Sequence, residues 1–164
     1  MSVKEHVQMA HYSQLRYGLR GAFFGTPRRH REERRVAENT TRLLKIFDVE
    51  QFAGLLAVNL PYGAQRRVEM ARAMAINPKI LFLDEPTAGM TPEELVQMIT
   101  IIRKVQAEFG VAIFLIEHRL KFVMELCQRI QTLVFGEVIA EGTPEQIQNN
   151  PKVIEAYLGK EDIT

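Results

Sequence analysis

Cysteine is nearly missing from this chain of 164 residues, because Cys127 is the only one. A single cysteine excludes an internal disulfide and cysteine-based zinc clusters, and it gives no sign of an oxidising compartment. Long apolar runs are also missing, since none approaches the roughly 18 to 20 residues that a membrane-spanning helix needs. The amino terminus has no export pattern. These absences predict a cytosolic protein; if it works at a membrane, something else must hold it there.

A strong excess of either charge is missing as well. The formal net charge is +1, so the composition does not indicate a polyanionic partner. The basic excess is local, because residues 1–45 carry a balance of +6 and the remainder −5. With 46% hydrophobic residues, the chain can bury one ordinary core.

The first part of the sequence has a helical and polar pattern. We expect helices over Ser2–Gln14 and Arg31–Ile46, separated by the Gly- and Pro-containing stretch Gly18–Pro27. A further helix is predicted over Pro61–Met74, because Pro is tolerated in a first turn and apolar residues recur there at helical spacing.

From residue 79 on, strands and helices alternate. Lys79–Leu83 and Val111–Ile116 are short apolar runs, typical of strands buried on both faces of a parallel sheet. The helix between them has Thr91 as its expected N-cap and ends at Phe109-Gly110. The other expected elements are helices over Leu120–Gln128, Pro144–Gln148 and Val153–Leu158, and strands over Ile130–Phe135 and Val138–Ala140. This order predicts an α/β fold with a mainly parallel sheet.

Titratable residues follow the first two predicted strands, where open α/β sheets bind ligands. Asp84 and Glu85 suit a nucleotide hydrolase, since one carboxylate can hold Mg²⁺ through its waters while the next orients the attacking water. His118 can accept from water or donate to a phosphate oxygen. Taken alone, an acidic turn and a structural histidine remain open alternatives.

A third element begins a predicted helix at Leu60–Arg67. The positive end of a helix favours a phosphate, and Gly63 allows close approach, although a simple helix start explains the same residues. In chain order, this segment, Ile80–Pro86, Ala88–Pro92 and Ile116–His118 resemble the signature motif, Walker B motif, D-loop and switch histidine of ABC-transporter ATPases.

The resemblance implies an incomplete P-loop NTPase core over residues 77–164, preceded over residues 1–76 by a helical subdomain that includes the signature helix. It implies ATP and Mg²⁺ as ligands, a dimer with a second ABC ATPase subunit, and membrane permease subunits as partners. The expected location is cytoplasmic, peripheral on the inner face of the plasma membrane.

The resemblance also assigns roles to five residues. Asp84 is implied as the Mg²⁺-side carboxylate, Glu85 as the residue that polarises the attacking water, and His118 as a contact to the γ-phosphate. Gly63 and Gln65 belong to the signature, which in this family covers the nucleotide on the opposing subunit.

Two features depart from the family's pattern. Pro61 and Tyr62 stand where Ser and Gly are usual, so a serine contact to the γ-phosphate is missing. No segment fits the Walker A pattern, because the only Gly-Lys pair, Gly159-Lys160, has Ile154 where the first Gly should be. The family's Walker A and glutamine loop lie upstream, and Met1–Val7 resembles the segment just after the glutamine loop.

We therefore expect a carboxyl-terminal fragment that is inactive alone. A truncated gene, a start placed at an internal Met, and a deliberately shortened chain are equally compatible with this pattern. A fragment without the Walker A strands should expose unpaired strand edges and apolar faces, which predicts poor solubility or self-association.

The subfamily is indicated by three segments. Glu117–Cys127, Glu141–Ile147 and Pro151–Gly159 are similar to ATPase subunits of branched-chain amino acid importers. We therefore predict an ATP-binding and ATP-hydrolysing subunit of such an importer, here truncated. A non-catalytic remnant, or the ATPase of a urea importer or lipopolysaccharide exporter, remains an alternative.

The local basic excess allows a further alternative, a small nucleic-acid binder. A solvated helical face interrupted by Glu32 and Glu33, on a subdomain that faces membrane subunits in this family, is the preferred interpretation, and no nucleic acid is expected. The arginines concerned are Arg16, Arg20, Arg28, Arg29, Arg31, Arg34 and Arg35.

Overall fold

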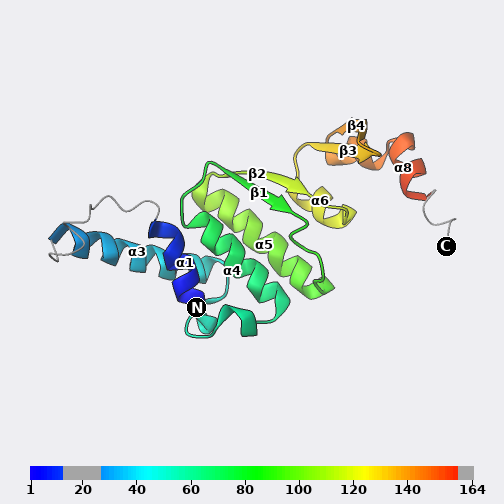
Figure 1. The fold of residues 1–164 in the computed structure, drawn as a ribbon. Coiled ribbons are helices and arrows are strands. Elements are labelled where there is room, and N and C mark those ends of the chain that lie inside the picture. Colours follow the sequence, from blue (N-terminus) through cyan, green and yellow to red (C-terminus); the bar gives the residue numbers. More distant parts are fainter. Residues whose placement is uncertain (13–26, 159–164) are drawn as a thin grey trace. The chain divides into compact units, whose positions relative to one another are not determined.

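The computed structural model describes residues 1–12 and 27–158 (Figure 1). They belong to two compact units, Met1–Phe114 and Leu115 onward. The stretch Gly18–Thr26, with Arg16 and Arg20, and the Gly159-Lys160 pair lie outside the described residues. The division expected between residues 76 and 77 concerns the subdomains of the ATPase family and stays a prediction.

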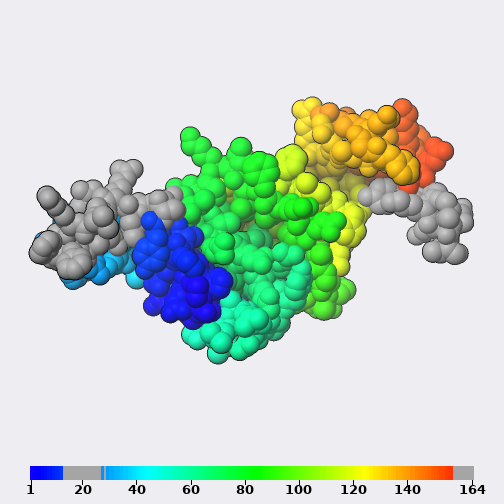
Figure 2. Space-filling model, in the orientation of Figure 1, coloured from blue at the N-terminus to red at the C-terminus, as the bar shows by residue number. Residues whose placement is uncertain are grey.

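The first unit begins with α1, Val3–His11. Ser2 and Glu5 form a capping box, in which the Glu5 backbone N–H donates to Ser2 Oγ and the Ser2 N–H to Glu5 Oε2. Hydrogen bonding from the Ser2 backbone N–H, and then from the Ser2 side chain, lowers the pKa of the Glu5 carboxyl. α1 lies beside the loop of residues 53–57, because the Val3 N–H donates to Leu55 O at 2.9 Å (Figure 2).

The long helix α3, Pro27–Ile46, begins four residues before the expected start. Its exposed part is held by i,i+4 ion pairs, Arg29 with Glu33 and Arg34 with Glu38. Such pairs contribute only a few tenths of a kcal/mol each. Its last turns are buried, and the chain then passes through two short 3₁₀ turns, Glu50–Phe52 and Ala57–Asn59.

The predicted helix after Pro61 is confirmed as α4, Tyr62–Met74, with Pro61 as N-cap. Its apolar positions Val68, Ala71 and Met74 are all buried. The helix ends before Asn77, whose φ of 53° lies in the left-handed region.

A strand–helix–strand unit follows: β1 (Ile80–Asp84), α5 (Pro92–Phe109) and β2 (Ala112–Ile116). β1 and β2 are parallel neighbours (Figure 1). The expected caps of α5 are confirmed, since Thr91 and Glu94 form a capping box and Gly110 ends the helix at φ 60°.

The expectation that β1 and β2 are buried on both faces is wrong. Leu81 and Leu83 are buried, but Phe82 is 71% and Phe114 55% exposed, and Ile80 is exposed as well. The reason is that α4 and α5 lie on one side of the two strands (Figure 1). The other face carries Phe82 and Phe114 as an aromatic pair with ring centroids 5.6 Å apart. The expected uncovered apolar face is thus confirmed.

The second unit contains α6 (Leu120–Leu126), which ends two residues before its expected end, and an antiparallel hairpin of β3 (Ile130–Val134) and β4 (Glu137–Gly142). α7 (Pro144–Gln148) and α8 (Pro151–Leu158) complete it. Its core contains Ile130, Ala140, Ile147 and Val153. In the described part of the chain, no helix is long and apolar enough to cross a membrane.

The open face of β1 and β2 predicts self-association that depends on Phe82. Replacing Phe82 by Ser should weaken association by about tenfold or more, because a buried Phe contributes roughly 1.5–3 kcal/mol. Val96→Ser, which removes an exposed apolar side chain from α5, is the matched control. Sedimentation velocity over a concentration series measures this, and equal association of Phe82→Ser and the unaltered chain would contradict it.

A second prediction concerns the stability of the first unit at mildly acidic pH. Burial, and then the charge of Arg35, lower the pKa of His11 below its ordinary value of 6.5. Because the unfolded chain then binds the proton more readily, this contribution is fully present above pH 6.5 and is lost as pH falls through 6.5 toward the folded pKa. Asn39 Nδ2 lies 3.5 Å from His11 Nε2.

The urea midpoint should therefore be lower at about pH 5.5 than at about pH 7.5. This interval lies above the range in which carboxylates titrate. His11→Gln should reduce this fall, whereas His30→Gln, at an exposed position of α3, should leave it in place. If the urea midpoint falls as much in His11→Gln as in His30→Gln, His11 is not the source of the pH dependence.

Candidate functional site

The turn after β1 carries the two predicted carboxylates. Asp84 ends the strand and Glu85 follows with φ 43°, and both residues are exposed. The left-handed region is unfavourable for a residue with a side chain, and such strain clusters at functional sites. The Ala88 N–H closes the turn by donating to Glu85 O at 3.1 Å. Thr87, within the turn, is fully buried. Glu85 is therefore fixed at the carboxyl end of β1 rather than on a loose loop.

The carboxylates at this turn fit one part of a magnesium site. They do not form a site whose ligands all come from the protein. Among the described residues, no group of three or more His, Cys, Asp or Glu side chains could hold a metal ion. Mg²⁺ commonly takes one or two carboxylates and completes its shell with waters and substrate phosphates. An exposed Asp84 at a strand end is compatible with that mode.

The start of α4 lies against the chain that follows this turn. An ideal Cβ on buried Gly63 would be 2.9 Å from Glu94 Cδ, and closer still to Glu94 Oε1. Tyr62, the residue before Gly63, approaches Gly89, because an ideal Cβ on Gly89 would lie 3.4 Å from the Tyr62 ring. Two segments that sequence analysis treated separately, Leu60–Arg67 and Ala88–Pro92, are thus packed together.

Gln65 has a local structural role in addition to the one expected for it. Its Nε2 donates to Leu60 O at 2.8 Å and to Val58 O at 3.4 Å. The side-chain amide thereby fixes the loop that leads into α4. The expected role of Gly63 and Gln65 at a nucleotide stays a prediction.

Arg66 orients Tyr62, one of the two residues that depart from the family's signature pattern. Arg66 Nε donates to the Tyr62 hydroxyl at 2.9 Å, and the guanidinium lies 5.1 Å from the ring centroid. The bond to Glu69, and then that to Tyr62, raise the pKa of Arg66. The i,i+4 spacing of Tyr62 and Arg66 on a predicted helix was the signal available in the sequence.

His118 lies in the second unit, where its side chain is 64% exposed. The Glu117 side chain beside it is fully buried, and the sequence pattern indicates no role for that residue. A short apolar strand ending in Glu-His offers no signal for which of the two side chains turns inward. The joint site expected from Asp84, Glu85 and His118 stays a prediction.

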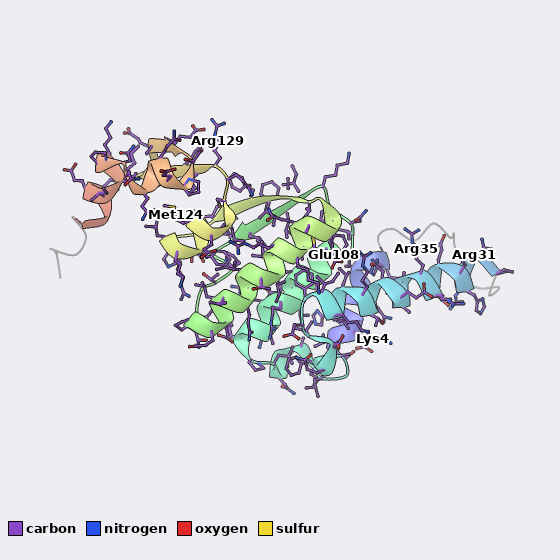
Figure 3. All side chains as sticks on the ribbon, turned by 180° about the vertical axis from the view of Figure 1, so that it is seen from behind. Lys4, Arg31, Arg35, Glu108, Met124 and Arg129 are labelled. Carbon is purple, nitrogen blue, oxygen red and sulfur yellow. The ribbon has the colours of Figure 1, made fainter. Side chains whose placement is uncertain are left out.

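The basic helix α3 is a solvated face within the described residues. Arg31 and Arg35 project from it (Figure 3). Arg29 and Arg34 are paired with Glu33 and Glu38. This alternation of charge is typical of exposed helices rather than of a phosphate-binding stripe.

Comparison with known proteins identifies the family. A family profile described as ABC transporter matches residues 1–88, more than half of the chain. The chain belongs to the ABC transporter family. A second profile, described as branched-chain amino acid ATP-binding cassette transporter, matches residues 137–163 of this cassette. The predicted family and its branched-chain amino acid type are thus confirmed.

Curated relatives point the same way. The high-affinity branched-chain amino acid transport ATP-binding proteins BraF of Pseudomonas aeruginosa and LivG of Escherichia coli K12 are each 40% identical over 160 residues. Those alignments cover 98% of this cassette chain and 63% of each relative. The lipopolysaccharide export system ATP-binding protein LptB of Haemophilus influenzae is 34% identical over 136 residues, 83% of this chain and 54% of LptB. The chain therefore spans somewhat under two thirds of the length of BraF and LivG.

Solved structures confirm the α/β cassette fold. The ADP conformation of MJ1267, an ATP-binding cassette of an ABC transporter, matches with a TM-score of 0.75 at 27% identity, over 97% of this chain and 63% of that one. A nucleotide-free ATP-binding cassette from an ABC transporter matches with a TM-score of 0.74 at 27% identity, over 96% and 62%.

The contact between Gly63 and Glu94 predicts that Gly63→Ala destabilises the first unit. The added methyl group forces Glu94 to move, and Glu94 also accepts from the Thr91 N–H at 2.9 Å. Overpacking and a weakened cap should cost about 1–2 kcal/mol, which the better helix propensity of Ala in α4 offsets by at most about 1 kcal/mol. Urea unfolding measures this against Gly54→Ala, whose Cβ meets nothing within 4 Å. If both variants unfold at the same midpoint, the packing argument fails.

Proposed function

We propose that the protein is the ATP-binding and ATP-hydrolysing subunit of an ABC importer of branched-chain amino acids. In this proposal Asp84 serves the Mg²⁺ side of the nucleotide and Glu85 polarises the attacking water. His118 contacts the γ-phosphate. BraF and LivG are named as branched-chain amino acid transport proteins, and we extend that substrate class to this chain.

The observation that carries the proposal is the turn after β1. An Asp-Glu pair follows a strand of the cassette fold, and Glu85 is held there at φ 43° by a closed turn. Ligands of open α/β sheets lie outside the carboxyl ends of the strands. A carboxylate held in an unfavourable backbone conformation at that edge supports a catalytic role better than a solvated acidic turn does.

When bound, Mg²⁺ would neutralise charge on the transferred phosphoryl group, with Asp84 supplying a carboxylate to its shell. Glu85 acts as the general base, which accepts the proton of the attacking water. Exposed carboxylates suit this task because water and nucleotide can reach them.

The start of α4 supports a role toward a second subunit. Its first backbone N–H groups lie at the positive end of a helix of 13 residues, and its N-cap, Pro61, offers no side-chain acceptor. Gly63 and Gln65 would thereby cover a nucleotide on an opposing ATPase subunit. The dimer would act on membrane permeases from the cytoplasmic side of the plasma membrane, as a peripheral subunit.

Lipopolysaccharide export is a second candidate, favoured by the 34% identity to LptB. Higher identity to BraF and LivG over more of the chain, together with the branched-chain amino acid profile at residues 137–163, supports import of branched-chain amino acids over export.

The hydrolytic role of Glu85 is testable in a hybrid. The hybrid joins the chain to the part of BraF that lies outside the matched 160 residues. Glu85→Gln should lower Mg²⁺-dependent ATP hydrolysis by about 10²- to 10⁴-fold, as expected for loss of a general base, with ATP binding retained. Glu93→Gln, in the first turn of α5, should change neither quantity and is the matched control.

The 164-residue chain alone, measured in parallel, should not hydrolyse ATP above the level of its Glu85→Gln variant. Turnover by the chain alone that Glu85→Gln abolishes would reveal a phosphate cradle within these residues. Equal hydrolysis by the hybrid and its Glu85→Gln variant would contradict the role of Glu85 and favour a non-catalytic protein.

A further inference from the structure

Tyr62 connects the start of α4 with the chain that follows Glu85. It is the first residue of α4, and it is 44% exposed. An ideal Cβ on Gly89 would lie 3.4 Å from Tyr62 Cε1 and 3.5 Å from Tyr62 Cδ1. One edge of the ring therefore lies over the side of Gly89 where any other residue would carry its Cβ.

Gly89 belongs to the same run of turns as Glu85. The Ala88 N–H donates to Glu85 O, and the Met90 N–H donates to Thr87 O, each at 3.1 Å. These two overlapping turns hold Glu85 at φ 43° and Gly89 at φ 72°, both in the left-handed region. Because the turns share residues 87 and 88, a displacement of Gly89 is transmitted to Glu85.

The orientation of the Tyr62 ring is fixed from its own helix. Arg66 Nε donates to the Tyr62 hydroxyl at 2.9 Å, and the guanidinium carbon lies 5.1 Å from the ring centroid. Arg66 Nη1 in turn donates to Glu69 Oε2 at 2.8 Å. A tyrosine side chain has only two χ angles, so a bond at its far end leaves the ring little freedom. The ring is therefore a rigid spacer between α4 and Gly89.

Two consecutive residues of α4 thus contact two different segments. Gly63 approaches Glu94 of α5, whereas Tyr62 approaches Gly89 in the turns before α5. A glycine in place of Tyr62, which the family's signature usually has, would keep the first contact and lose the second. The departure from the signature pattern therefore adds a contact to the run of turns that begins at Glu85.

We propose that Tyr62 is a positioning residue for Glu85. Its ring, held by Arg66, rests on Gly89 and keeps the two overlapping turns after β1 in one arrangement. The contact itself lies within the first unit. Its meaning for hydrolysis rests on the proposed function, in which Glu85 is the general base. A misplacement of about 1 Å can lower turnover by about 10²-fold, so a small release of these turns is sufficient to matter.

Hydrogen exchange measures how often these turns open in the complete 164-residue chain, without nucleotide. Tyr62→Ala should speed exchange of the Ala88 amide by about tenfold or more, because the ring that restrains the turns is lost. The amide of Ile102, a buried residue of α5, should respond less, which separates release of the turns from a general loss of stability. Tyr62→Phe keeps the ring and should cause a clearly smaller rise at Ala88.

Tyr12→Ala is the matched control for the loss of a tyrosine. It removes a residue that is 62% exposed at the end of α1 and should leave exchange at Ala88 unchanged. If Tyr62→Ala does not fold, Arg66→Met decides, because loss of the bond to the hydroxyl should still speed Ala88 exchange by about threefold. Unchanged exchange at Ala88 in the folded variant overturns the proposal. An equal rise at Ile102, or an equal rise in Tyr62→Phe, also overturns it.

The hybrid with the BraF part tests the consequence for hydrolysis. Tyr62→Ala should lower kcat by about tenfold or more while KM for ATP stays within about twofold, because a positioning residue does not bind the nucleotide. Tyr62→Phe should restore most of kcat. An unchanged kcat, or a change in KM alone, would contradict the positioning role. A hybrid without Glu85-dependent hydrolysis would count against the proposed function and leave the exchange result valid.

Discussion

The first unit depends on one close approach, that of the Gly63 backbone to the Glu94 carboxylate. A methyl group there would overlap the carboxylate unless the Glu94 side chain moved out of its present position. Glu94 meanwhile completes the capping box that starts α5. One side chain therefore sets both where α5 begins and how near α4 comes to it. The Tyr62 ring against Gly89 extends the same contact to the turn after β1. The segments that bear the family's motifs are thus positioned by packing among themselves.

The sequence predicted the elements whose ends are marked by local chemistry. Thr91 and Gly110 indicated the bounds of α5, and the spacing of Val68, Ala71 and Met74 indicated the buried side of α4. Local signals of this kind act within a few residues, so they can be recognised without knowledge of the fold. The fold class followed from the order of these elements.

The sequence did not predict features that depend on what lies across space. An apolar run such as Ile80–Leu83 has the same pattern whether one or both faces are covered, so the exposure of Phe82 had no local signal. The candidate site shows the same limit. Asp84, Glu85 and His118 were found because they follow apolar strands, whereas Glu94, from the capping box of a neighbouring helix, and buried Glu117 required the structure. Gln65 was noticed, but its bonds to Leu60 O and Val58 O were not foreseeable from its place in a motif.

The hairpin of the second unit carries a residue that its turn does not favour. Phe135 and Gly136 both have positive φ, at 49° and 85°, the pattern of type I′ turns, in which Asn-Gly is the preferred pair. A bulky L-residue in that conformation costs roughly 1–2 kcal/mol. Burial of Ile130 and Ala140 together with Ile147 of α7 and Val153 of α8 supports the register of β3 and β4 despite this cost. Replacing Phe135 by Asn would therefore raise the thermostability of this unit through a single substitution in the turn.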